Sequence, residues 1–347
     1  FKMDGDDFAY TREGAHSRPR ILYHEDITGK EITRHLLEKV RQKKNVTLLE
    51  NTPLVDLIVR GNVALGGVIK RNNQEEKVYA KKVVLAPGRD GSAWLTKVLS
   101  NQGLKLYNNQ VDIGVRVETS NIVMEEINKN LYEGKFVYNT SVGTKVRTFC
   151  SNPSGHVVIE NHSGTMLANG HAYHDPKLGS KNTNFALLVS HTFSEPFNEP
   201  NEFAHEISRL ANKLSNGSVI VQRYGDIKRG RRTTEERLCR NNLIPTLKDA
   251  VPGDLSLVFP HRIMVDIEEM ILALDKVTPG IAADETLLYG VEVKFYSNKV
   301  VVNKDFETSV AGLRAIGDGA GVTRGLQQAS ANGISVARSI LRKMDEN

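Results

Sequence analysis

A glycine-rich turn near the C-terminal end of the sequence carries the residues best suited to chemistry. Asp318 stands among three alternating glycines, directly after the short apolar stretch 313–316; these glycines are Gly317, Gly319 and Gly321. Glycines let the backbone bend tightly and let a ligand approach it closely. A helix expected over 326–343 would point its N-terminal amides at the turn. The turn therefore suits a polyhydroxylated, electron-rich ligand, although a capping Asp in an ordinary turn has the same spacing.

A second glycine turn follows the apolar strand expected over 78–85. It contains Gly88, after Ala86 and Pro87, and it leads into a helix expected around 94–102. Before it the pattern indicates a helix from about 28 to 43, a strand over 47–50, and a strand over 54–59 that includes Val55. A Gly-Asn hairpin turn at 61–62 leads into the next strand.

Other chemical candidates are weaker. Cys150 lacks a Cys-x-x-Cys partner, and free cysteines are most often small buried hydrophobes. His171 and His174 lack an identifiable distant metal ligand, so we expect no metal site. His171 alone remains a candidate for substrate contact or proton transfer, because its ordinary pKa is near neutrality. Arg147 and Arg324 each lie beside an expected turn, where a fixed cation could orient a carboxylate.

The C-terminal turn resembles the flavin motif of a family of FAD-dependent dehydrogenases without an assigned substrate. The resemblance is carried at the turn by residues 315–321, 323–325 and 328–331, and upstream by segments 146–153, 169–171, 182–189, 225–234 and 245–250. It implies FAD as the cofactor, with Asp318 on a ribityl hydroxyl and the helix N-terminus at the pyrimidine edge of the flavin. It places these residues around the cofactor: Val55, Gly88, Gly317, Gly319, Gly321, Gln327, Gln328 and Ala329.

The N-terminal region resembles a different group of flavoproteins. Residues 12–23, 26–30 and 45–58 are similar to L-aspartate oxidase, of the succinate dehydrogenase and fumarate reductase group. This likeness covers roughly the first 85 residues. It implies that Glu13 lies beside the substrate; a solvated, salt-bridged loop is the alternative for the same segment.

These patterns predict an α/β fold: a Rossmann-like FAD-binding domain interrupted by an inserted, β-rich α+β domain. The expected divisions are 1–108 and 288–347 for the FAD-binding domain and 109–287 for the insertion. Within the insertion, 111–118 alternates apolar and polar residues, which predicts a half-buried strand. Helices are expected over 200–214, 232–241 and 261–274. The sequence has no Gly-x-Gly-x-x-Gly turn for the pyrophosphate, and we interpret this as a missing N-terminal segment.

Composition sets outer bounds on the partners. The 347 residues carry a net charge of +5, and 25% are charged. The basic run 228–232 is broken by acids and lacks aromatic residues, so nucleic acid is the weakest hypothesis. Two cysteines and the absence of a membrane-length apolar run favour a cytoplasmic protein without a membrane partner. The expected partner is a small molecule, with carboxylates among the candidates, and a homo-oligomer is compatible with the sequence.

The sequence thus predicts an FAD-dependent oxidoreductase that moves hydride between a small substrate and the flavin. Arg147, His171 and Glu13 are the candidate catalytic residues. L-Aspartate oxidation is one alternative, and a truncated or non-catalytic protein that keeps the flavoprotein fold is another.

Overall fold

The computed structural model describes residues 1–11, 18–25, 27–131, 133–194, 196–197 and 199–345. The chain divides into two compact units, each made of three segments. Unit 1 contains residues 1–40, 111–191 and 201–294, and unit 2 contains 41–110, 192–200 and 295–347. The domain limits predicted from the sequence stay a prediction. No helix among the described residues is long and apolar enough to cross a membrane.

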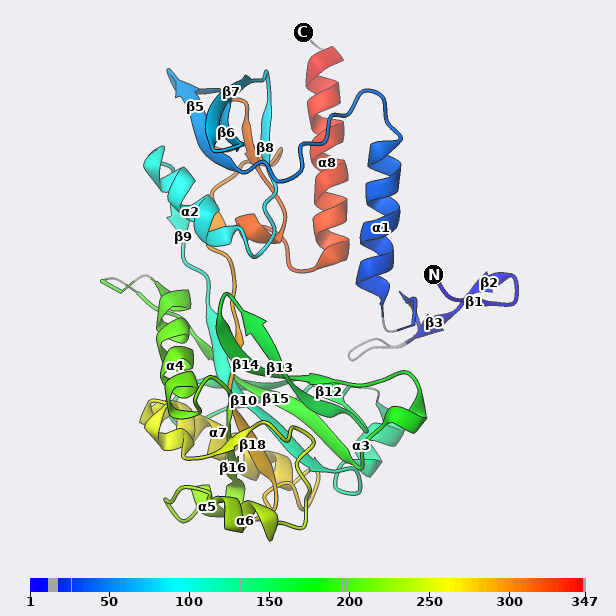
Figure 1. Cartoon of the computed structure of the whole chain (residues 1–347), viewed down its shortest axis with the longest axis vertical. Helices are drawn as coiled ribbons and strands as arrows, with labels where there is room; N and C mark the ends of the chain where they lie inside the picture. Colours follow the sequence, from blue (N-terminus) through cyan, green and yellow to red (C-terminus); the bar gives the residue numbers. More distant parts are fainter. Residues whose placement is uncertain (12–17, 26, 132, 195, 198, 346–347) are drawn as a thin grey trace. The chain divides into compact units, whose positions relative to one another are not determined.

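Unit 1 is built on a large mixed sheet (Figure 1). Among the described residues, seven strands form it in the order β11-β12-β15-β10-β18-β16-β17. Neighbours are antiparallel except β16 and β17, which run parallel. The strands are β10 (Val111–Ser120), β11 (Val137–Asn139), β12 (Lys145–Asn152), β15 (Asn182–His191), β16 (Ile220–Arg223), β17 (Val251–Pro252) and β18 (Leu287–Lys294).

A separate hairpin and several helices cover this sheet. The hairpin, β13 (His156–His162) and β14 (Thr165–His171), packs on β16 and β18 through a buried apolar cluster that includes Val157, Val221 and Tyr289. Helix α7 (His261–Asp275) packs against β12 and β15. The other helices of this region are α3 (Glu125–Asn130), η1 (Pro176–Leu178), α4 (Pro200–Leu214), α5 (Tyr224–Ile227), α6 (Glu235–Cys239) and η2 (Leu255–Leu257). The N-terminal region contributes β1 (Met3–Asp4), β2 (Asp7–Phe8), β3 (Tyr10–Thr11), β4 (Ile21–Leu22) and α1 (Thr28–Arg41).

Unit 2 combines an antiparallel sheet with a parallel pair of strands. The sheet contains β5 (Leu54–Arg60), β6 (Val63–Arg71) and β7 (Gln74–Tyr79), and the parallel pair contains β8 (Val83–Leu85) and β20 (Leu313–Ala315). A common apolar core joins them to α2 (Ser92–Asn101). The unit also contains β9 (Leu106–Tyr107), β19 (Lys299–Val300), η3 (Asp318–Ala320) and α8 (Leu326–Asp345).

The mixed α/β class expected from the sequence is confirmed, but several local predictions are wrong. Residues 47–50 form no strand, because their apolar side chains remain exposed. The strand expected over 78–85 is two strands, β7 and β8, separated by a break at 80–82. The helix expected over 232–241 shortens to α6. The sequence did not predict strand β14. It ends in Asn, Gly and His, and Asn and Gly are residues typical of turns.

The largest correction concerns β10. The alternation over 111–118 predicted one solvated face, yet residues 111–119 are all buried. Asp112, Arg116 and Glu118 are on the polar face and have no exposed surface. The pattern separated the two faces correctly, but it could not tell that the hairpin β13–β14 covers the polar one.

Candidate functional site

The glycine turn of unit 2 begins where β20 ends. Gly317 has φ 75° and ψ −171°, and Gly321 has φ 67° in the left-handed region, so glycine suits both positions. A Cβ on Gly319 would lie 2.1 Å from the carbonyl oxygen of Gly88. The two glycine turns predicted from the sequence therefore touch, and only glycine allows that approach.

Asp318 lies in this turn with 16% of its side chain exposed. Its carboxylate accepts hydrogen bonds from Thr323 Oγ1 at 2.6 Å, from the Gly325 amide at 2.9 Å and from the Arg89 guanidinium at 3.1 Å. Partial burial raises the pKa of Asp318, but these hydrogen bonds and the Arg89 charge outweigh it and hold the pKa below its ordinary value. Asp318 is therefore an ionised hydrogen-bond acceptor, and Arg89 is its most exposed partner, at 56%.

A hollow of about 390 Å³ lies at the end of β8, directly before Gly88 in the chain. Its walls are mostly apolar and include Leu54, Leu85, Pro87 and Trp94. That volume is in the range of small-molecule sites. The predicted cofactor residue Val55 lies in the neighbouring strand β5, where it is partly exposed.

The start of α8 follows the turn. Gln328 Oε1 accepts a hydrogen bond from the Arg324 amide at 2.8 Å, and Gln327 is exposed. Ala329 donates its amide to Gly325. The Arg324 guanidinium stacks over the Tyr296 ring at 4.7 Å. These contacts fix the amides of Arg324 and Ala329 at the start of α8 and leave Gln327 exposed.

Arg147 and His171 belong to unit 1, so they and the glycine turn are described separately. Arg147 donates to Asp112 Oδ2 at 2.6 Å and stacks over Phe149. His171 ends β14 and packs edge-on against the Tyr173 ring at 4.7 Å. Glu13, the third candidate catalytic residue, lies outside the described residues. The described residues contain no group of three His, Cys, Asp or Glu side chains that could hold a metal ion.

A buried ion pair lies at the centre of the large sheet. Arg116 donates to both carboxylate oxygens of Glu292, at 2.8 and 2.9 Å. It also donates to Asn169 Oδ1 and to the Cys150 carbonyl. Removing two charges from water is costly unless their remaining hydrogen bonds are made, and these partners make them. Cys150 is half-buried, and its amide donates to a Glu133 oxygen at 2.7 Å.

Comparisons with known proteins agree on the cofactor. The model described as "FAD-dependent protein, C-terminal domain-like" matches residues 110–295, and the one described as "FAD binding domain" matches 1–111. The first match covers more than half of the chain. The chain belongs to this FAD-dependent family. FAD is the cofactor that both descriptions name.

Individual relatives match smaller parts. An L-aspartate oxidase of Clostridium perfringens is 36% identical over 116 residues, which are 33% of this chain and 26% of that protein. A Clostridium beijerinckii protein with no function in its name is 27% identical over 81% of this chain and 58% of its own length. A solved quinol-fumarate reductase with menaquinol molecules has a TM-score of 0.42 at 14% identity, covering 97% of this chain and 52% of that one. The chain therefore spans about a quarter to three fifths of the length of these proteins.

The glycine turn of this family member fits the hydroxylated part of FAD. Asn332, on α8, accepts the Gly317 amide at 2.9 Å through Oδ1. Its Nδ2 atom is buried and has no hydrogen-bond partner in the described part of the chain. Such a donor beside an ionised acceptor suits a ligand rich in hydroxyl groups.

Sequence reasoning missed two residues that contact the C-terminal glycine turn, Arg89 and Asn332. Arg89 directly follows Gly88, so a cation next to a predicted turn was a usable signal. Asn332 gave no signal, because a polar residue within a helix usually faces water.

The charges of the basic run 228–232 are largely paired within the protein. Lys228 and Arg229 pair with Asp284, and Arg231 pairs with the buried Asp226.

Proposed function

We propose that this protein is an FAD-dependent oxidoreductase whose glycine turns at 86–89 and 317–321 hold the flavin end of the cofactor. The main support is the ionised Asp318, which lies in a turn that only glycines permit. When bound, FAD accepts or donates a hydride, which is the redox chemistry of the reaction. The protein's residues bind and orient it.

Asp318 has a defined role in this proposal. Its Oδ2 accepts from Arg89, whose side chain is more than half exposed, and Oδ1 accepts from Thr323. The Gly325 amide is shared between both oxygens, at 2.9 Å from Oδ2 and 3.1 Å from Oδ1. A ribityl hydroxyl would replace Arg89 on Oδ2, and the Asn332 amide would donate to a second ligand oxygen. Arg89 would then be free to face a cofactor anion. Gly88, Gly317, Gly319 and Gly321 admit the ligand to the backbone, and Val55, Gln327, Gln328 and Ala329 complete the proposed site.

Arg147 and His171 are the proposed substrate residues on unit 1. Arg147 is fixed by Asp112 and by the Phe149 ring, so it is oriented rather than free, as carboxylate recognition requires. His171 is proposed for substrate contact or proton transfer. Glu13 is proposed with them from sequence alone.

FAD binding by the purified chain tests the proposal. We expect added FAD to lose fluorescence and to stay with the protein through dialysis. Replacing a charged hydrogen-bonding group typically costs about 1.5–3 kcal/mol, so Asp318→Asn should weaken binding about tenfold or more. Asp90→Asn, at an exposed acid next to Arg89, is the matched control and should bind as the parent does. A chain that leaves FAD fluorescence unchanged, or binding unaffected by Asp318→Asn, would overturn the assignment.

L-Aspartate oxidation is the second candidate, favoured by the 36% identity to the Clostridium perfringens L-aspartate oxidase. Anaerobic addition of L-aspartate to the FAD-loaded protein should bleach the flavin absorbance if it is right. Other amino acids and hydroxy acids, added in parallel, would reveal a different substrate class. Retained FAD without bleaching by any of them would favour a non-catalytic flavoprotein.

A further inference from the structure

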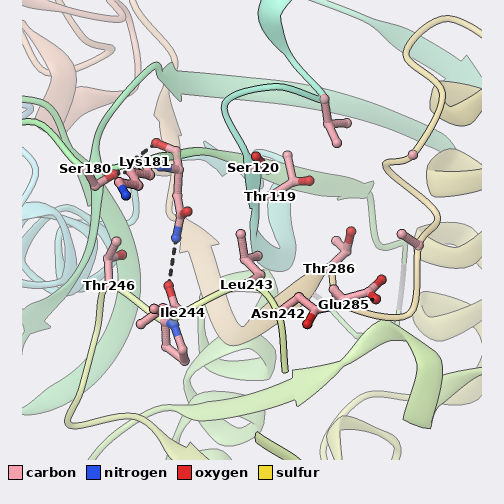
Figure 2. A pocket seen from close by; sticks show the side chains of 15 residues that line it. Thr119, Ser120, Ser180, Lys181, Asn242, Leu243, Ile244, Thr246, Glu285 and Thr286 are labelled. Carbon is pink, nitrogen blue, oxygen red and sulfur yellow. Dashed lines mark hydrogen bonds between the residues drawn. The ribbon is translucent and has the colours of Figure 1, made fainter. Parts of the chain in front are cut away.

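Unit 1 contains a cavity that the flavin proposal does not use. Its volume is about 550 Å³, within the range of small-molecule sites. Three stretches line it: the end of β10 with residues 180–182, the loop 242–246, and residues 280–286 (Figure 2). All of them belong to unit 1.

Hydrogen bonds between these stretches hold the cavity open. Asn182 Nδ2 donates to the Ile244 carbonyl at 2.8 Å, which joins the first stretch to the second (Figure 2). Asn241 Nδ2 donates to the Glu285 carbonyl at 2.8 Å, which joins the second to the third. The buried Glu118 carboxylate also joins the first two stretches, because it accepts hydrogen bonds from Asn182 Nδ2 and from Thr246 Oγ1. A site whose walls are already fixed loses little ordering entropy when it binds a ligand.

The cavity presents opposite charges and one unused acceptor. Lys181 and Glu285 lie on opposite sides of it in Figure 2. Lys181 forms no ion pair with any residue the structure describes, and the Glu285 carboxylate accepts from Asn242 at 3.2 Å. Asn182 is only 6% exposed, yet its amide oxygen accepts no hydrogen bond from the described residues. A ligand that pairs with all three groups carries an anion, a cation and an N–H donor.

Apolar side chains also line the cavity. Ile244 is 76% exposed although it lines the cavity beside Leu243 and Pro245. Covering an exposed isoleucine side chain contributes favourably to binding, at about 25 cal/mol per Å². The ligand therefore also has an apolar body.

We propose that this cavity binds a short peptide with free termini and an apolar side chain. The C-terminal carboxylate pairs with Lys181, the N-terminal ammonium pairs with Glu285, and a backbone N–H donates to Asn182 Oδ1. The apolar side chain covers Ile244. A single amino acid fits less well, because its two charges are neighbours and it has no peptide N–H.

Calorimetric titration of the full chain with Ala-Leu-Ala tests the ligand class. The N-acetylated and the C-amidated peptide each lack one charge, and each should bind about tenfold more weakly, which corresponds to about 1.4 kcal/mol. Free leucine should bind more weakly than the tripeptide. Equal binding of the capped peptides, leucine binding as tightly as the tripeptide, or no heat at all would overturn the proposal.

Variants place the binding in this cavity. In Lys181→Ala, C-amidation of the peptide should no longer weaken binding. In Glu285→Gln, N-acetylation should no longer weaken binding. Ile244→Ser should weaken the binding of every peptide. Lys276→Ala and Glu236→Gln alter exposed charges elsewhere in unit 1 and should bind like the parent. Circular dichroism checks that each variant is folded. Cavity variants that are folded and bind like the controls would place the peptide elsewhere and refute the assignment.

Discussion

At the scale of single residues, the turn chemistry depends on how Asp318 is stabilised. Three donors hold its carboxylate, and they lie near it in sequence except Arg89, which is 229 positions away. The sequence pattern around the glycines predicted the strand, the turn and the position of Asp318 within it, because these features depend only on neighbouring residues. The long-range partner could not be predicted, since spacing says nothing about which distant loop packs on a turn.

The lowered pKa of Asp318 leads to a pH-dependent stability. A carboxyl group whose folded pKa is depressed stabilises the fold above its unfolded pKa of about 4, and that stabilisation is lost as pH falls through the folded value. Asp318→Asn should therefore melt below the parent at neutral pH, and the gap should shrink below about pH 4. Thermal melts of both proteins across this range measure it, with Asp90→Asn as control. A gap that stays constant down to pH 3 would contradict the prediction.

At the scale of elements, the long helices were predictable, whereas short helices and the covered faces of strands were not. Helices α4 and α7 begin where their apolar periodicity begins and end within a residue of the expected position. Strand β10 shows the limit: its alternation marks two faces, but only the hairpin β13–β14, with Asn169 on Arg116, decides that the polar face is buried. Periodicity reports a difference between faces and leaves open what covers each of them.

Two glycine substitutions after β20, one in the turn and one in helix α8, should change the stability of the fold in opposite directions. Gly319→Ala would push a methyl group against the Gly88 carbonyl, 2.1 Å away, so it should cost about 1–3 kcal/mol and weaken FAD binding. Gly333→Ala, within α8, meets nothing within 4 Å and should stabilise the fold by about 0.5–1 kcal/mol. Urea unfolding measures both. Equal effects of the two changes would mean that the turns do not touch as described.

At the scale of the whole molecule, the two units differ in how far apart in the sequence their paired strands lie. The large sheet of unit 1 uses strands from Val111 to Lys294 only, whereas the parallel pair of unit 2 joins strands from both flanks. A fragment of residues 110–295 should therefore fold by itself, unfold cooperatively and keep the peptide cavity, without binding FAD. A fragment of residues 41–110 lacks β20 and should not unfold cooperatively. Calorimetric melts of both fragments test this, and a disordered 110–295 fragment would refute it.

The pairing of β8 with β20 also determines when the turn site can form. During synthesis β8 leaves the ribosome long before its parallel partner exists, and the Arg89–Asp318 contact closes a loop of 229 positions. Long-range pairings of this kind form slowly, because loop closure must precede the contacts that stabilise it. The sheet of unit 1 can form before β20 is synthesised. Until then β8 is an unpaired apolar strand, and exposed unpaired strands are prone to aggregation. Chaperone binding to the nascent chain should therefore concentrate in the interval between the synthesis of these two strands.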